Sequence, residues 1–146
     1  MINVGKLLEV KGKALWSVHP DDSVFDAIKL MDEKGTGALV VVADDALVGI
    51  ISERDYARKV ILKGRQSKET LVKEIMSRQV YHTFAEQDVE DCLAVMTKHH
   101  IRHLPVMADK KLIGMISMGD VVKEILVKQK QEIEHLEHYI SWEESF

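Results

Sequence analysis

Gly49-Ile50-Ile51-Ser52-Glu53-Arg54-Asp55 recurs 65 residues later as Gly114-Met115-Ile116-Ser117-Met118-Gly119-Asp120. Around these stretches, residues 18–59 align without a gap on residues 83–124. The alignment has 12 identities in 42 positions, where chance would give only a few. Because self-similarity at a fixed spacing indicates one structural unit used twice, the sequence predicts a tandem repeat.

The repeat sets the expected domain organisation. We expect one copy in residues 1–65, a second in 66–130 and a helical tail in 131–146. One copy of about 60 residues buries little apolar surface and is marginal alone. Two copies are therefore expected to pack around a pseudo-twofold axis and to leave clefts between them, which are common ligand sites.

Each copy is predicted to begin with a short strand and a helix. In the first copy, Val24, Ala27, Ile28 and Met31 fall at i, i+3, i+4 and i+7, the spacing of one apolar helix face. Ser23 and Asp26 form a capping-box pattern before it, and Gly35 is typical of a helix end.

A hairpin and a second helix follow. Apolar runs at 39–43 and 47–51 are joined by Asp44-Asp45-Ala46, and their β-branched content favours paired strands. The next helix is expected at about 54–62, before Gly64. Its counterpart begins near Gly119 and is expected to continue into the tail. Each unit is thus β-α-β-β-α, an α/β (α+β) fold.

Composition excludes several classes of protein. The net charge is −4, which gives no basic footprint for nucleic acid. The single cysteine, Cys92, permits no internal disulfide or thiolate zinc site, and a cytoplasmic setting is expected. No apolar run approaches the length of about 20 residues needed for a membrane span, and the first residues lack a signal-peptide pattern.

The duplicated motif resembles the CBS-domain pair, or Bateman module, over roughly residues 1–130. The third feature that carries the resemblance is Ile101-Arg102-His103-Leu104-Pro105-Val106. The resemblance implies a non-enzymatic regulatory module that binds an adenine nucleotide (AMP, ADP, ATP or NAD) between its repeats. No metal is implied, and CBS pairs usually assemble as dimers.

The resemblance also implies which residues bind the nucleotide. The Asp of each motif would accept hydrogen bonds from ribose hydroxyls, the Ser would face sugar or phosphate, and backbone at 102–105 would frame adenine. The implied positions are Thr83, Arg102, His103, Leu104, Pro105, Ser117, Gly119 and Asp120 in the second copy, and Val18, Ala38, Ser52, Arg54 and Asp55 in the first.

The same residues have a purely structural interpretation. Ser52-x-x-Asp55 and Ser117-x-x-Asp120 are ordinary capping boxes, and capping explains both carboxylates without a ligand. The second copy adds features that the first lacks, namely the Arg102–Pro105 segment and Gly119, where backbone can approach a ligand closely. We therefore expect the Asp120 site to be the tighter one, with Arg102 or Arg54 binding phosphate through its planar donors.

Other residues suggest chemistry more weakly. His99, His100 and His103, and His135 with His138, are clustered without a partner at metal-ligand spacing, so surface roles are favoured over a metal. Cys92 lies on an apolar helix face and is expected in the core. Pro105 removes a ladder donor, so its strand is predicted to be an edge or locally irregular.

The tail is predicted to continue the last helix over 120–142. Two seams repeat at seven residues, consisting of Leu126, Ile133 and Ile140, and of Val122, Gln129 and Leu136. This pattern indicates a short coiled coil and a homodimer, with Trp142 and Phe146 against a partner subunit. The alternative is a helix packed on its own domain.

Three functions are distinguishable at this point. The first is a nucleotide sensor that regulates another, unidentified protein chain, because ligand binding shifts the balance between its conformations. The second is a structural dimerisation or interaction module with no physiological ligand. The third, an enzyme, lacks a Ser–His or Cys–His arrangement, a Walker-type loop or a metal constellation to support it.

Overall fold

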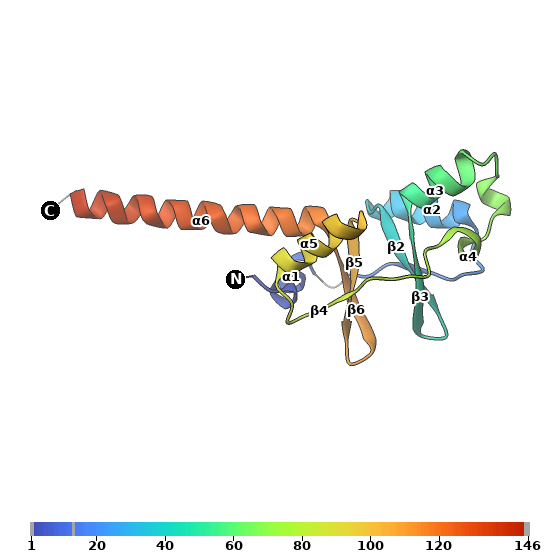
Figure 1. Ribbon diagram of the computed structural model, residues 1–146, viewed down its shortest axis with the longest axis horizontal. Helices are drawn as coiled ribbons and strands as arrows, with labels where there is room; N and C mark the ends of the chain where they lie inside the picture. The colour runs from blue at the N-terminus through green and yellow to red at the C-terminus, as the bar shows by residue number, and fades with distance from the viewer. Residues whose placement is uncertain (1, 13, 145–146) are drawn as a thin grey trace. The chain divides into compact units, whose positions relative to one another are not determined.

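A computed structural model describes residues 2–12 and 14–144 (Figure 1). The predicted role of Phe146 lies outside these residues. In chain order, the elements are α1 (Val4–Lys11), β1 (Ser17–Val18), α2 (Val24–Lys34), β2 (Ala38–Ala43), β3 (Ala46–Ser52), α3 (Glu53–Tyr56), the π-helix η1 (Ala57–Ile61), the 3₁₀-helix η2 (Ser67–Glu69), α4 (Val72–Ile75), β4 (Thr83–Phe84), α5 (Val89–His99), β5 (His103–Ala108), β6 (Lys111–Ser117) and α6 (Met118–Glu144).

The described chain divides into two compact units that do not follow the repeat boundaries. The first unit comprises residues 14–82 and 109–113, and the second comprises the rest. α1 therefore belongs with the sheet of the second repeat, and α4 belongs with the sheet of the first. The predicted domain boundaries, with one repeat in residues 1–65 and the other in 66–130, therefore stay a prediction.

Each repeat contributes one three-stranded sheet. The strand orders are β1-β2-β3 and β4-β5-β6, so the middle strand of each sheet is the first strand of a hairpin. β1 runs parallel to β2, and β2 runs antiparallel to β3 with Leu39 opposite Ile51. The mixed α+β class and the β-α-β-β-α order that we predicted are confirmed.

α2 begins and ends as its sequence predicts. The Ser23 hydroxyl accepts a hydrogen bond from the Asp26 N–H at 3.1 Å, and Gly35 ends α2 in the left-handed conformation, with φ of 64°. In α5 the corresponding helix end is His100, with φ of 55°. Because this conformation disfavours most side chains, His100 has a structural role at the end of α5.

Both hairpins turn through two residues with positive φ. Asp44 and Asp45 have φ of 51° and 61°, and Asp109 and Lys110 have φ of 49° and 65°. Paired positive φ values define a type I′ turn, whose twist matches that of the flanking strands. The turn is thus one residue shorter than predicted, because Ala46 already belongs to β3.

Of the two alternatives predicted for the strand of Pro105, an edge or a local irregularity, the edge is wrong. β5, which contains Pro105, is the middle strand of its sheet. β4 is only two residues long and pairs with Val106 and Met107, so Pro105 lies before the residues that pair with it. The short neighbour explains how a middle strand accommodates a residue without an N–H group.

The second helices differ between the repeats. In the first, α3 lasts four residues and continues as the π-helix η1, before Gly64 at φ of 67°. In the second, α6 runs from Met118 to Glu144, which confirms the predicted continuation into the tail. Sequence reasoning missed α1, α4 and the π-helix.

The first glycine of each motif is packed against an apolar side chain of its own unit. A Cβ at Gly49 would lie 2.7 Å from Met76 Sδ, and one at Gly114 would lie 2.9 Å from Leu8 Cδ2. Both glycines therefore have a packing reason: they allow α4 and α1, respectively, to approach the last strand of a sheet.

Candidate functional site

The Ser-x-x-Asp motif of the first unit forms a complete capping box. The Asp55 N–H donates to Ser52 Oγ at 3.3 Å, and the Ser52 N–H donates to Asp55 Oδ2 at 2.9 Å. The Ser52 hydroxyl also donates to Oδ2, and Lys59 Nζ lies 3.1 Å from Oδ1. Both oxygens of Asp55 thus have partners within its own unit.

The motif of the second unit forms the same cap with a different cation. The Asp120 N–H donates to Ser117 Oγ at 3.1 Å, and the Ser117 N–H donates to Asp120 Oδ2 at 2.9 Å. Lys11 of α1 lies 2.7 Å from the same Oδ2 and donates to the Met115 carbonyl at 2.7 Å. The capping interpretation is therefore confirmed in both repeats.

The two carboxylates differ in how accessible their oxygens are to a ligand. The Asp55 side chain is 15% exposed and has contacts on both oxygens, whereas Asp120 is 26% exposed and has its contacts with Lys11 and the Ser117 N–H on Oδ2. An acceptor with remaining lone pairs and solvent access can bind a further hydroxyl. The geometry of Asp120 suits a ligand better than that of Asp55.

Lys11 is the functional candidate that sequence reasoning missed. It is the last residue of α1, and Gly12 follows at φ of 95°. The Asn3 side chain accepts from the Lys6 N–H at the helix start, so an N-cap and a terminal glycine marked this helix in the sequence. What the sequence did not reveal is that α1 lies beside the second motif.

The charges around Asp120 shift its protonation. Burial alone would raise the pKa of Asp120, but hydrogen bonds from Lys11, from the Ser117 N–H and from the Ser117 side chain, together with the charge of Lys11, hold this pKa below its ordinary value. The group is therefore a carboxylate at neutral pH, able to accept hydrogen bonds from two adjacent hydroxyls.

His103 lies in the same electrostatic environment. Burial lowers the pKa of His103, the positive charges of Lys11 and Arg102 lower it further, and Asp120 opposes them. The imidazole is therefore neutral at pH 7. A neutral ring adds no charge to the site and can either donate or accept a hydrogen bond.

The lowered pKa of His103 predicts a stability change with pH. The folded protein binds the His103 proton less tightly than the unfolded chain does. Neutral His103 therefore contributes fully to the free energy of unfolding above the ordinary pKa of 6.5, and this contribution is lost as the pH falls below that value. We expect the free energy of unfolding, measured in urea from about pH 7.5 to 5, to fall less steeply in His103→Gln than in the unaltered protein. Equal slopes would contradict the assignment.

The remaining predicted site residues separate into buried and exposed groups. Val18, Ala38, Leu104 and Pro105 are buried, so their side chains are not available to a ligand in solution. Thr83 is also buried, and its hydroxyl lies 3.3 Å from Cys92 Sγ, which confirms Cys92 as a core residue. Arg54, Arg102 and Gly119 are exposed, and the Arg102 carbonyl accepts from the Met118 N–H at 2.8 Å.

Gly119 has room for a side-chain carbon, which would make an ordinary van der Waals contact. The nearest atom to a Cβ at this position is Ser117 Oγ, at 3.7 Å. Its φ does not lie in the left-handed region, so the backbone conformation does not require glycine there. Neither packing nor conformation explains this glycine, in contrast to Gly49 and Gly114.

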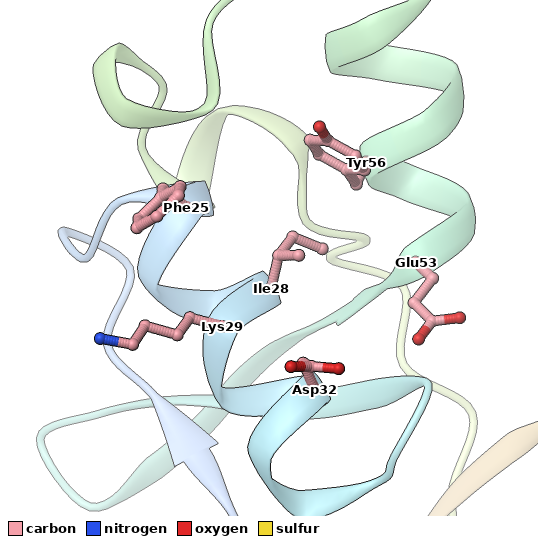
Figure 2. Close-up of a pocket in the computed structure, with 6 residues that line it drawn as sticks. All are labelled: Phe25, Ile28, Lys29, Asp32, Glu53 and Tyr56. Atoms are coloured by element: carbon pink, nitrogen blue, oxygen red, sulfur yellow. The ribbon is translucent and has the colours of Figure 1, made fainter.

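A pocket in the first unit lies apart from the predicted residues. It is lined by side chains of α2 and α3, with Ile28 between the two helices and Tyr56 facing it (Figure 2). The lining residues are Phe25, Ile28, Lys29, Asp32, Glu53 and Tyr56. Ile28, predicted on the buried face of its helix, is only partly buried and belongs to this pocket.

Over residues 2–12 and 14–144, no group of three or more His, Cys, Asp and Glu side chains is arranged to hold a metal ion. No helix in the same part of the chain is long and apolar enough to cross a membrane.

The fold and the two motifs define a tandem pair of β-α-β-β-α units with capped motif helices. A sequence model of the CBS domain matches residues 9–62 and 72–127, and the chain belongs to the CBS-domain family. The resemblance inferred from the motifs is confirmed.

Relatives and solved structures agree with this assignment. The chain is 42% identical over 147 residues to the mitochondrial CBS domain-containing protein CBSX3 of Arabidopsis thaliana, covering 94% of this chain and 71% of the relative. The structure of a protein with CBS domains from Burkholderia ambifaria is 48% identical, with a TM-score of 0.84, covering 87% of this chain and 96% of the other.

One further structure contains ligands. The CBS domain pair of protein MJ0100, in complex with 5-methylthioadenosine and S-adenosyl-L-methionine, is 25% identical with a TM-score of 0.78. The likeness covers 88% of this chain and 98% of that chain.

Proposed function

We propose that this protein is a non-enzymatic regulatory module that binds an adenine nucleotide at Asp120 and signals energy or redox state to another protein. One observation supports this most directly: Asp120 is a partly exposed carboxylate at a helix start, with its contacts to Lys11 and the Ser117 N–H on one oxygen. A related CBS pair in complex with two adenosine compounds supports the adenine part.

Each candidate site residue of the second unit has a proposed role in binding the nucleotide. Asp120 accepts hydrogen bonds from the ribose hydroxyls, and Ser117 and Gly119 lie along the sugar and phosphate. Arg102 is the proposed phosphate ligand, because its side chain is exposed and its guanidinium presents several donors. Backbone at His103, Leu104 and Pro105, together with that of Thr83, frames the base.

The first unit is proposed as a weaker or secondary site. Its corresponding residues are Val18, Ala38, Ser52 and Asp55, with Arg54 as a further phosphate ligand. Asp55 has partners on both oxygens, so a ligand there must displace Lys59 or share its contact. Because a ligand at Asp55 would have to displace Lys59 or share its contact, we expect the first site to bind the nucleotide more weakly than the Asp120 site.

Calorimetry of ligand-stripped protein tests the proposal. The protein is unfolded, washed and refolded, then titrated with AMP, ADP, ATP and NAD, with GMP as the control for base recognition. We expect saturable binding of at least one adenine nucleotide and weaker binding of GMP. Absence of binding of all four adenine nucleotides at millimolar concentration would disprove the function.

Gly119→Ala tests the close approach of a ligand. The added methyl group fits the protein itself but occupies the space in which a ligand would meet the backbone. We expect affinity to fall about tenfold, an effect of about 1.4 kcal/mol, while the melting temperature stays unchanged or rises slightly because alanine favours helix. Unchanged affinity for the nucleotide would remove Gly119 from the site.

The second candidate function, a structural interaction module, is favoured by a different observation. Several large apolar side chains of α6 are more than half exposed, which is the pattern of a helix that binds another chain. The two functions are compatible within one protein. A homodimer and a cytoplasmic location remain proposals, and the CBSX3 relative is mitochondrial.

A further inference from the structure

Within the part of the chain that the structure describes, α6 carries an apolar stripe that stays exposed. Only the beginning of the helix packs inward, with Val121 fully buried, and Figure 1 shows the helix continuing past α1 and α5 of the same unit. Beyond that point Leu126, Ile133, Leu136 and Ile140 are 54–59% exposed. The α6 seam consists of Val122, Leu126, Gln129, Ile133, Leu136 and Ile140.

The spacing of the seam is that of a two-stranded coiled coil. Its residues alternate at four and three along the helix, which keeps them on one side over almost three heptads. A mostly polar helix of this length is marginal alone, because packing of an apolar face supplies most helix stability. The seam therefore needs a partner.

The charges of α6 indicate what that partner is. Residues 121–131 contain three lysines and one glutamate, a net charge of +2, whereas residues 132–142 contain three glutamates and no lysine or arginine, a net charge of −3 with histidine neutral. A second copy lying parallel would place like-charged halves together. A second copy lying antiparallel would place the basic half of each helix against the acidic half of the other.

The charged residues beside the seam also favour an antiparallel second copy. In a parallel pair Glu132 would face Glu137 of the second copy, twice by symmetry. In an antiparallel pair, Glu137 would face Lys123 or Lys130 of the second copy, depending on the register. The Lys123 register also places Lys130 against Lys130 of the second copy, so charge favours the Lys130 register. Gln129 favours a parallel pair, because the amides of the two copies would face each other and could form a hydrogen bond. This one hydrogen-bonded pair does not outweigh the two Glu132–Glu137 repulsions and the repulsion between like-charged halves of the helices.

We propose that α6 is a dimerisation surface on which two copies of this chain form an antiparallel coiled coil. The orientation is independent of nucleotide binding, since none of the seam residues belongs to the Asp120 site. It also places the two Asp120 sites near opposite ends of the shared coil rather than side by side.

Charge reversal distinguishes the two orientations by the sign of one effect. Glu137→Lys replaces an attraction by a repulsion in the antiparallel pair, and does the opposite in a parallel pair. From the strength of exposed ion pairs, we expect the dimer dissociation constant at low salt to rise about tenfold. Sedimentation equilibrium measures it, and Lys123→Glu/Lys130→Glu/Glu137→Lys should restore the dimer.

Glu134→Lys is the matched control, because it makes the same charge change on a side of the helix away from the seam. A tighter dimer in Glu137→Lys, an equal effect of both variants, or a monomer at all concentrations would overturn the proposal. The first outcome indicates a parallel pair, and the last leaves the seam to a different protein.

Distances between spin labels provide a second measurement if the dimer is too tight to dissociate. Single labels are placed at Gln131 and Glu124 in a Cys92→Ala background, since the first repeat has alanine at the matching position, Ala27. In an antiparallel pair the axial separation between the two labels of a dimer is about 20 Å larger at position 124 than at 131, at roughly 1.5 Å per residue. Similar distances at both positions would overturn the antiparallel arrangement.

Discussion

Asp120→Asn is expected to weaken adenine-nucleotide binding by roughly 10–100-fold. The carboxylate is the proposed acceptor for two ribose hydroxyls, and hydrogen bonds to a charged group contribute about 1.5–3 kcal/mol. Asparagine keeps the shape of the side chain and can still cap the helix, but it loses the charge and presents a donor where the ligand needs an acceptor. Calorimetry with AMP or NAD measures the loss.

Asp55→Asn is the matched control for Asp120→Asn. It makes the same change in the corresponding motif of the first unit, where Asp55 is already saturated by Ser52 and Lys59. We expect an affinity change of less than about threefold at the tighter site, on the order of 0.6 kcal/mol. Thermal unfolding of both variants shows whether the fold is intact. Unchanged affinity in Asp120→Asn would mean that this residue only caps α6.

Removing Lys11 would separate its two effects on the site. Lys11 occupies one oxygen of Asp120, so it competes with a hydroxyl, but its ammonium also offers positive charge to a phosphate. Comparing adenosine with AMP in Lys11→Met resolves this. A larger loss for AMP than for adenosine identifies a phosphate contact, and a gain for both identifies competition.

The helix caps and hairpins were predictable because they are encoded by adjacent residues. Ser23 and Asp26 cap α2 within one helical turn, and the two-residue turns depend on backbone conformations that Asp accepts more readily than most residues. The tandem repeat was equally accessible, because both copies of the motif lie in one chain at a constant spacing. These features need no knowledge of distant contacts.

The features that were not predicted depend on contacts between distant parts of the sequence. Lys11 reaches Met115 and Asp120, more than a hundred residues away, and no local pattern indicates that pairing. Proline removes a ladder donor and so predicts an edge or an irregular strand at Pro105, but the length of β4 decides whether that donor is needed. The contrast between the two carboxylates is partly local: Lys59 contacts the second oxygen of Asp55 from one helical turn away, and Glu124 stands at the matching position of the second repeat.

Gly49→Ala is expected to destabilise the protein by about 1–3 kcal/mol, the usual cost of forcing a group into a packed site. Its Cβ would lie 2.7 Å from Met76 Sδ and 2.9 Å from the Ser77 carbonyl oxygen. The sulfur can move, but the carbonyl is held: the Ile50 N–H donates to the Ser77 carbonyl at 3.0 Å, and the Ser77 N–H donates to the Ile50 carbonyl at 2.9 Å. Urea unfolding measures the change.

The three motif glycines together make this prediction specific. A Cβ at Gly114 meets only Leu8, with the flexible end of that side chain 2.9 Å away, and a Cβ at Gly119 has no atom within 3.4 Å. The loss of stability on substitution by alanine should therefore be largest at 49, smaller at 114 and absent at 119. If all three variants lost equal stability, the cost would arise from replacing glycine itself. If the order holds, Gly49 and Gly114 belong to the packing of the fold, and Gly119 is left as the glycine that packing does not explain.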